Sequence, residues 1–233
     1  MITLLSPAKT LDYSKDFNFQ PSVPTFLNDS SKLVKGLKSK EPKDIASLMS
    51  LSDKLATLNF ERFQSWSAAK KIGADAKHAL FVFKGDVYQG LQAEDFSKGD
   101  VNFAQKHLRI LSGLYGELKP LDLIKPYRLE MGTKYKNERG DNLYQFWGDK
   151  IQKNILKELI DIKNVKPDVL TYLAICKIKS NKKNEAIDYL KNAISINPNH
   201  EFANLNLGLI SVSYTHLRAH ETRHDLVCRL LLE

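Results

Sequence analysis

Three cations and two carboxylates in the first 130 residues lie in short polar segments that also contain glycine. The cations are Lys9, Lys84 and Arg128, and the carboxylates are Asp86 and Glu130. Lysine supplies a point charge and arginine a planar fork of donors, so the cations together can hold an anion such as a phosphate group. The carboxylates can act as acid–base groups or orient the cations. The candidate ligand-binding residues are therefore Lys9, Thr10, Lys84, Asp86, Arg128 and Glu130.

A different interpretation needs no ligand. Lys84, Asp86, Arg128 and Glu130 can form buried ion pairs that join strand ends. The glycines favour a ligand site over this alternative, because a residue without a side chain lets the backbone approach a ligand closely. The three glycines concerned are Gly85, Gly113 and Gly132.

The elements that must position these residues are predicted strands. Residues 2–5 are predicted to form a short buried strand, and the apolar run at residues 79–83 a strand buried on both faces. Residues 108–111 are a further strand candidate. Ligands bind beyond the carboxyl ends of strands in open α/β sheets, so polar loops at these ends are expected to gather along one edge.

Residues 126–132 alternate between polar and apolar side chains. If this segment is extended, Arg128 and Glu130 lie on one side and Leu129 and Met131 on the other. The alternation therefore predicts that this one segment presents both a cation and a carboxylate to the candidate site.

Helices are predicted around these strands. Residues 26–80 have a broken helical spacing, with Asn28 or Asp29 as a cap of the first helix and Ser52 or Asp53 as a cap of a later one. Residues 143–159 carry apolar side chains at steps of three and four, which predicts one amphipathic helix. The expected fold class is mixed α/β.

Five sequence segments then give a specific resemblance. Their order and spacing, from residue 1 to about residue 160, resemble the successive motifs of the YaaA peroxide-stress family. The segments read SPAKTLD, FKGDVY, LSGLYG, PYRLEMG and LYQFWGD, at residues 6–12, 83–88, 111–116, 126–132 and 143–149. After about residue 160 the family pattern stops, so we expect the YaaA-like domain to be truncated and its sheet incomplete.

The resemblance implies a function. It implies a cytoplasmic bacterial protein that limits damage from unincorporated iron during hydrogen peroxide stress and binds double-stranded DNA. A non-enzymatic stress protein is the favoured interpretation. Two alternatives stay open: an enzyme that acts on a phosphate-containing metabolite through the candidate residues, and an interaction module in the carboxyl-terminal third.

A basic run supplies the candidate DNA contacts. Lys35, Lys38, Lys40 and Lys43 can contact phosphates with sequence-independent, salt-sensitive affinity, although a solvated helical face has the same pattern. No glycine lies between Gly36 and Gly73, so the sequence does not place a helix-hairpin-helix element there.

Composition excludes several classes. The 233-residue chain has a net charge of +8 and two cysteines, which argues against a disulfide-rich mini-protein and an acidic disordered tail. The apolar stretches are too short for a signal peptide or a membrane span, so a cytoplasmic protein without a membrane partner is expected. His78 and His107 are isolated and no metal-ligand spacing occurs, so neither a metal nor a cofactor is expected.

Residues 161–210 differ from the preceding sequence. Ala186, Leu190, Ala193 and Pro198 occur at steps of four, three and five, and Leu173-Ala174 recurs as Leu207-Gly208 after 34 residues. These features resemble a tetratricopeptide repeat, with small residues where paired helices approach. An all-α helical-repeat fragment is therefore expected, although about three repeats are needed to bury a continuous face.

Residues 211–233 form the last predicted region. His216, His220 and His224 are spaced by four, as in a helical metal site. However, residues 212–221 and 225–233 correspond in one frame to codons that resemble a transposase end and a sequencing adapter. We therefore expect no domain here, and a chimeric chain as a whole.

Overall fold

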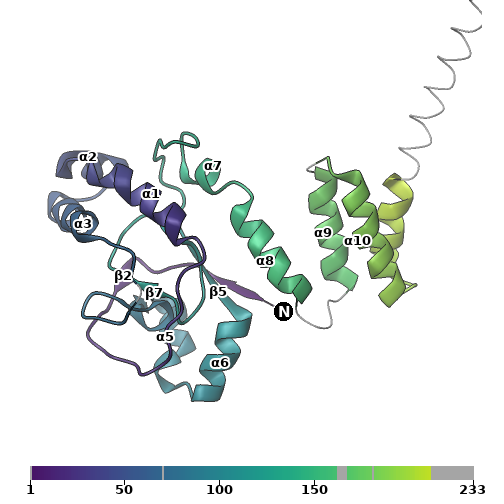
Figure 1. The fold of residues 1–233 in the computed structure, drawn as a ribbon, viewed down its shortest axis with the longest axis horizontal. Helices are drawn as coiled ribbons and strands as arrows, with labels where there is room; N and C mark the ends of the chain where they lie inside the picture. Colours follow the sequence, from purple (N-terminus) through teal and green to yellow (C-terminus); the bar gives the residue numbers. More distant parts are fainter. Residues whose placement is uncertain (1, 70, 162–166, 180, 211–233) are drawn as a thin grey trace, which may run out of the picture. The chain divides into compact units, whose positions relative to one another are not determined.

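The computed structural model describes residues 2–69, 71–161, 167–179 and 181–210. The chain divides into two compact units, residues 1–153 and 154–233. The first unit has small sheets with helices packed around them, and the described residues of the second unit are mainly helical (Figure 1). The predicted mixed α/β class is confirmed.

The first unit contains one three-stranded sheet and two strand pairs. The sheet has the order β1 (Thr3–Leu5), β5 (Leu108–Ser112) and β6 (Gly116–Leu118). The pairs are β2 (Thr10–Leu11) with β4 (Phe83–Lys84), and β3 (Lys77–His78) with β7 (Leu123–Ile124). β1 runs parallel to β5, and β6 runs antiparallel to it. The strands predicted at residues 2–5 and 108–111 are confirmed. β1 is an edge strand and not buried, since Leu4 is 49% exposed.

The strand predicted at residues 79–83 is wrong. Residues Ala79–Val82 form a helical turn, α4, between β3 and β4. The Ala79 amide donates to the Asp122 carbonyl at 2.9 Å, and the Leu80 amide to the Pro120 carbonyl at 3.0 Å. These bonds satisfy the first amides of the turn, which a helix cannot satisfy itself. All the side chains of the run are buried, so its burial was predicted correctly.

The broken helices predicted within residues 26–80 are confirmed. They are α1 (Leu27–Lys38), α2 (Pro42–Met49) and α3 (Asp53–Ser65). A capping box of Glu41 and Asp44 begins α2. Ser52 occupies the N-cap position of α3 as predicted, whereas α1 has Phe26 there instead of Asn28 or Asp29.

The single helix predicted at residues 143–159 is two helices, α7 (Leu143–Trp147) and α8 (Lys150–Asp161). Gly148 separates them with φ 49° and ψ −125°, a conformation that no helix continues through. The boundary between the two units falls within α8. The first unit also contains α5 (Asp86–Leu91), the 3₁₀ turn η1 (Ala93–Asp95) and α6 (Lys98–His107).

The main core joins helices α1 to α3 and α7 to strands β5 and β6. Its buried side chains include Leu33, Leu37, Phe63, Ile110, Tyr115 and Trp147. A second cluster joins α4, η1 and α6 and includes Leu80, Val101 and Leu108. Burial of these side chains removes apolar surface from water and so holds the strands that end at the candidate site.

The second unit contains α9 (Pro167–Lys179), α10 (Lys183–Ile196) and helical residues 201–210. Ala186, Leu190 and Ala193 are fully buried between the helices. The tetratricopeptide interpretation stays a prediction, and the adapter interpretation of residues 211–233 lies outside the described residues. No helix in the described ranges has both the length and the apolar character to cross a bilayer.

Candidate functional site

Three of the six predicted ligand-binding residues lie together. The Glu130 carboxylate oxygen Oε1 is 3.1 Å from Lys9 Nζ and 3.5 Å from Arg128 Nη2. Lys9 follows β1 in the chain, whereas Arg128 and Glu130 follow β7, so the fold brings these segments together. The side chains of Lys9 and Glu130 are 63% and 51% exposed, and that of Arg128 is 22% exposed.

These three residues line two adjoining cavities. The larger cavity, which we call the basic groove, has a volume of about 780 Å³. It is lined by Lys9, Ser47, Leu48, Met49, Ser50, Arg128, Glu130, Gly132, Thr133 and Lys134. A more apolar side lobe of about 440 Å³ shares Lys9, Arg128, Glu130 and Gly132 with the groove and adds residues such as Leu111, Met131 and Tyr144. The charged residues therefore stand where a polar groove meets an apolar one.

A buried hydroxyl pair anchors the segment that carries Arg128. Tyr127 Oη and Ser112 Oγ are 2.6 Å apart, and Ser112 Oγ also accepts the Tyr115 amide at 3.0 Å. Burial raises the pKa of Tyr127 well above its ordinary value, so this phenol stays protonated at neutral pH. Leu129 is buried, whereas Glu130 is exposed. The predicted alternation is thus present, although the segment pairs with no neighbouring strand.

Gly113 permits a close approach of the backbone of Leu129 and Glu130, and not of a ligand as predicted. A Cβ at Gly113 would lie 2.3 Å from the Leu129 carbonyl oxygen and 2.9 Å from the Glu130 carbonyl carbon. The Trp147 indole Nε1 also donates to the Gly113 carbonyl at 3.0 Å. At Gly132, in contrast, a Cβ would meet no atom within 4 Å. Gly113 therefore allows the segment around Arg128 to pack against β5.

The other three predicted residues lie elsewhere. Thr10 is the strand partner of Lys84 in the β2–β4 pair, and Lys84 Nζ is 2.5 Å from Glu94 Oε1. Glu94 also accepts a hydrogen bond from Lys15, and the bonds from Lys15 and Lys84 lower the pKa of its carboxyl. Asp86 is exposed in the first turn of α5 and lines neither cavity.

The alternative of buried ion pairs among the predicted residues does not describe this arrangement. Lys84 pairs with Glu94 instead of with Asp86 or Glu130, and the Lys84 and Glu94 side chains are about one-third exposed. Arg128 does pair with Glu130, but half of the Glu130 side chain is exposed. Glu94 was not among the residues predicted from the sequence, because no spacing rule links it to a lysine ten positions earlier.

A helical hairpin at the basic groove was also missed. Residues 50–52 join α2 to α3, and Ser50 adopts the left-handed conformation with φ 52° and ψ 54°. The absence of glycine argued against a hairpin here, but serine occupies the position that glycine normally takes. The exposed Ser50 lines the groove, so the hairpin turn forms part of the site.

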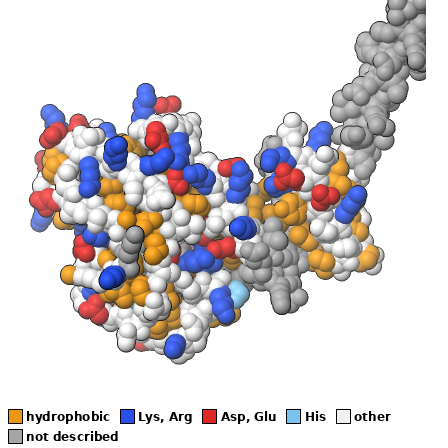
Figure 2. All heavy atoms as spheres, viewed as in Figure 1, with side chains coloured by type: hydrophobic (Ala, Val, Ile, Leu, Met, Phe, Trp, Pro, Cys, Tyr) orange, Lys and Arg blue, Asp and Glu red, His pale blue; other side chains and the backbone are white. Residues whose placement is uncertain are grey.

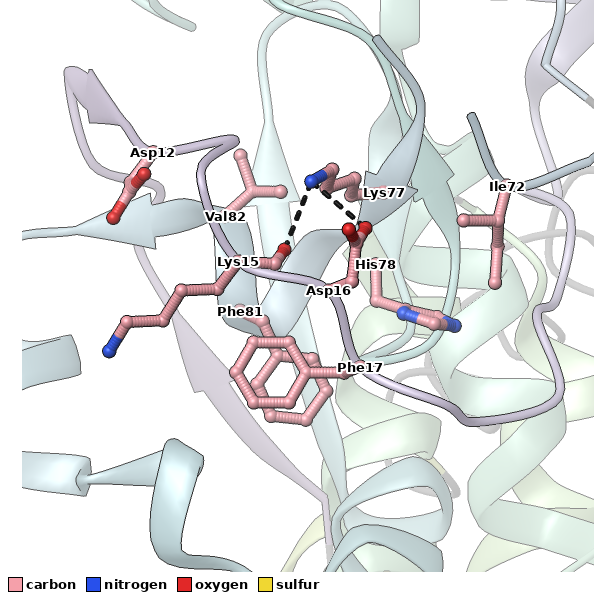
Figure 3. Close-up of a pocket in the computed structure, with 9 residues that line it drawn as sticks. All are labelled: Asp12, Lys15, Asp16, Phe17, Ile72, Lys77, His78, Phe81 and Val82. Carbon is pink, nitrogen blue, oxygen red and sulfur yellow. Dashed lines mark hydrogen bonds and ion pairs between the residues drawn. The ribbon is translucent and has the colours of Figure 1, made fainter. Parts of the chain in front are cut away.

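A small cavity beside β3 is structural (Figure 3). Its volume of about 10 Å³ is enough for about one water molecule. Lys77 Nζ lies 3.0 Å from Asp16 Oδ1 and donates to the Lys15 carbonyl at 3.1 Å, while Phe17 stacks on Phe81. The Lys77 side chain is only 10% exposed. It holds the segment that follows β2 in place, a role that the sequence did not suggest.

Comparison with known proteins is decisive for the family. A family model described as "Peroxide stress protein YaaA" matches residues 1–215. The chain belongs to the YaaA peroxide stress family. The resemblance found in the five sequence segments is thereby confirmed.

Curated relatives of the YaaA family agree. The chain is 50% identical over 160 residues to a UPF0246 protein of Burkholderia orbicola and 52% identical over 162 residues to one of Teredinibacter turnerae. It is 53% identical over 163 residues to one of Saccharophagus degradans. Each match covers 68% of this chain and 61% or 62% of the relative. The chain thus spans about three-fifths of the length of the curated relatives it matches.

The predicted DNA-contact lysines of this YaaA-family chain lie on α1, α2 and the turn between them. Lys35, Lys38 and Lys43 are exposed, and the Lys40 ammonium lies 5.8 Å from the centre of the Tyr135 ring. On the face shown in Figure 2, lysine and arginine side chains alternate with acidic ones. Within the described ranges, no group of three or more His, Cys, Asp or Glu side chains is placed to hold a metal ion.

Proposed function

We propose that this chain acts in the cytoplasm as a non-enzymatic peroxide-stress protein that binds double-stranded DNA and limits damage from unincorporated iron. Family membership supports the role in peroxide stress. The iron-related part comes from the family resemblance alone. DNA binding has additional support from the geometry of the basic groove.

The observation that carries the proposal is the convergence of cations in this groove. Lys9, Arg128 and Lys134 come from two segments far apart in the sequence and line one open cavity with the α2–α3 hairpin turn. Lysine and arginine contacts to phosphates supply most sequence-independent affinity for DNA. Lys35, Lys38, Lys40 and Lys43 on the neighbouring helices would extend the contact to further phosphates.

Salt-dependent binding tests the proposal. The full 233-residue chain is titrated against a labelled duplex by fluorescence anisotropy at several salt concentrations. Each lost phosphate contact reduces the magnitude of the slope of log K against log salt by about 0.9. The variant Lys9→Gln/Lys134→Gln loses two contacts, so the magnitude of its slope should be smaller by about 2 than that of the unmodified chain. Lys106→Gln is the control for a single lost charge, because Lys106 is exposed on α6 and lines neither cavity. Failure of the unmodified chain to bind duplex DNA at low salt would overturn the proposal.

A second candidate function is an enzyme that acts on a phosphate-containing metabolite. The buried Nε of Arg128 favours it, because this atom has no hydrogen-bond partner in the described part of the chain and Arg128 lines a side lobe with apolar walls. Against it, Lys84 and Asp86 lie outside the cavities that contain Lys9, Arg128 and Glu130. Isothermal titration with inorganic pyrophosphate provides the test, since no heat of binding would remove the basis for such an enzyme.

The third candidate concerns the second unit. The full burial of Ala186 and Ala193 supports the proposal that residues 161–210 are a tetratricopeptide fragment able to bind a peptide. Limited proteolysis of the full chain tests it, because a folded repeat should resist cleavage within α9 and α10. We also retain the proposal that residues 211–233 are translated adapter. Independent genomic DNA that encodes these residues without an adapter match would exclude it.

A further inference from the structure

The basic groove already contains one anion, the carboxylate of Glu130. A single oxygen of this carboxylate lies within 3.5 Å of both Lys9 Nζ and Arg128 Nη2. Each phosphate oxygen can be shared between neighbouring cations in the same way. Glu130 therefore stands where an anionic ligand of these two cations would stand.

Arg128 is incompletely satisfied by this carboxylate. Its Nε is buried and has no hydrogen-bond partner among the described residues. A buried donor without a partner is costly, and arginine pairs best when two of its N–H groups engage two oxygens. The contact between Glu130 and Arg128 is at Nη2, at the long distance of 3.5 Å. The contact is thus weaker than the bidentate contact that a phosphate group can make.

Exposure also favours exchange of the carboxylate. The Glu130 side chain is half-exposed and can rotate into water. Ion pairs at such positions contribute little to stability. Glu130 lines both the basic groove and the side lobe, so a ligand in either cavity would meet it.

We propose that Lys9 and Arg128 form a phosphate-binding site in which Glu130 is a resident anion, and that the phosphate group of a ligand displaces Glu130. The phosphate belongs either to the DNA backbone or to a small phosphate compound. For DNA the inference rests on the proposed function. Glu130 then weakens binding and restricts the site to anions that compete well for both cations.

The test replaces Glu130 with glutamine, which keeps the shape of the side chain and removes its charge. Glu138→Gln is the matched control, because Glu138 contacts Lys32 at 3.0 Å and Arg139 at 3.7 Å and is 53% exposed. Both variants change the net charge equally, but Glu138 lines neither cavity. Glu130→Ala gives a second version of the test if Glu130→Gln does not fold.

Duplex binding by the full chain is measured first, as a function of salt. Glu130→Gln should bind about three- to tenfold more tightly than the unmodified chain, and its salt slope should be steeper by about 0.9. Glu138→Gln should change affinity by less than twofold. Adding Arg128→Gln to the Glu130→Gln variant should abolish the gain. A purely structural role of Glu130 predicts the reverse, because its loss would then release Arg128 and weaken binding.

Titration with inorganic pyrophosphate separates the two phosphate sources and the two proposals. If the unmodified chain binds duplex but Glu130→Gln binds neither duplex nor pyrophosphate more tightly, the resident-anion proposal fails and the DNA-binding proposal stands. If no variant binds duplex but Glu130→Gln binds pyrophosphate more tightly than Glu138→Gln, DNA binding fails and a small-molecule phosphate site is supported. Absence of both effects overturns the inference.

Discussion

The close approach at Gly113 gives a sharp prediction for Gly113→Ala. The new Cβ would lie 2.3 Å from the Leu129 carbonyl oxygen, more than 1 Å short of an ordinary contact. The obstacle is backbone, so no side-chain rotation can relieve it. The segment with Arg128 and Glu130 must move away from β5, or β5 must bend.

The magnitude follows from two contributions. Overpacking of this kind costs about 1–3 kcal/mol. Movement of the Gly113 carbonyl also weakens its bond to Trp147, which contributes about 1 kcal/mol. We expect Gly113→Ala to lower the free energy of unfolding by about 2–4 kcal/mol. This is a large fraction of the stability of a typical domain.

Urea unfolding followed by tryptophan fluorescence measures the effect. Both tryptophans, Trp66 and Trp147, belong to the first unit, so the signal reports on that unit. Gly132→Ala is the control, since its Cβ meets no atom within 4 Å and its unfolding free energy should change by less than about 0.5 kcal/mol. Equal midpoints for the two variants would refute the reasoning. Gly113→Ala should also weaken duplex binding under conditions where it is still folded.

Two further predictions concern ion pairs outside the groove. Arg109 Nε and Glu117 Oε1 lie 3.0 Å apart, and both side chains are at most 4% exposed. Glu117→Gln should therefore lower the free energy of unfolding, measured with urea, by about 3–5 kcal/mol. An unchanged unfolding midpoint would contradict this. Burial alone would raise the pKa of Asp29, but hydrogen bonds from Arg139 and Lys150 outweigh it and lower the pKa. The stabilising contribution of Asp29 is therefore full above about pH 4 and is lost as the pH falls. The deficit of Asp29→Asn, measured by thermal unfolding, should shrink below pH 4, and a deficit that grows there would exclude this explanation.

The sequence predicted elements best where the apolar pattern had a period. The helical spacing in residues 26–80 and the strand at residues 108–111 are both found. The run at residues 79–83 has no period because every side chain is apolar and buried, so it could not distinguish a strand from a helical turn. The interruption of the helix at Gly148 could not be predicted, because the helical spacing of apolar residues continues across it.

The candidate site was predicted in part for a similar reason. Lys9 was chosen because it follows the strand predicted at residues 2–5. Arg128 and Glu130 were chosen because the alternation in residues 126–132 puts them on one side. The structure places the three together. Lys84 and Asp86 follow the strand predicted at residues 79–83, as Lys9 follows the one at residues 2–5, but they lie outside both cavities. Residue type and strand position therefore identify candidates, but the direction in which each strand end leaves the sheet depends on tertiary contacts.

The register of the three-stranded sheet has a consequence for the order of folding. Ile110 pairs with the nearby Leu118, whereas Thr3 pairs with Leu108. Closing the long loop between β1 and β5 costs more entropy than closing the β5–β6 turn, so β1 should dock after the hairpin has formed. Lys9 lies in the short segment between β1 and β2, so we expect it to reach Arg128 only at this late step. The groove would therefore be among the last parts of the first unit to form. The rate at which duplex binding appears during refolding would measure when this step occurs.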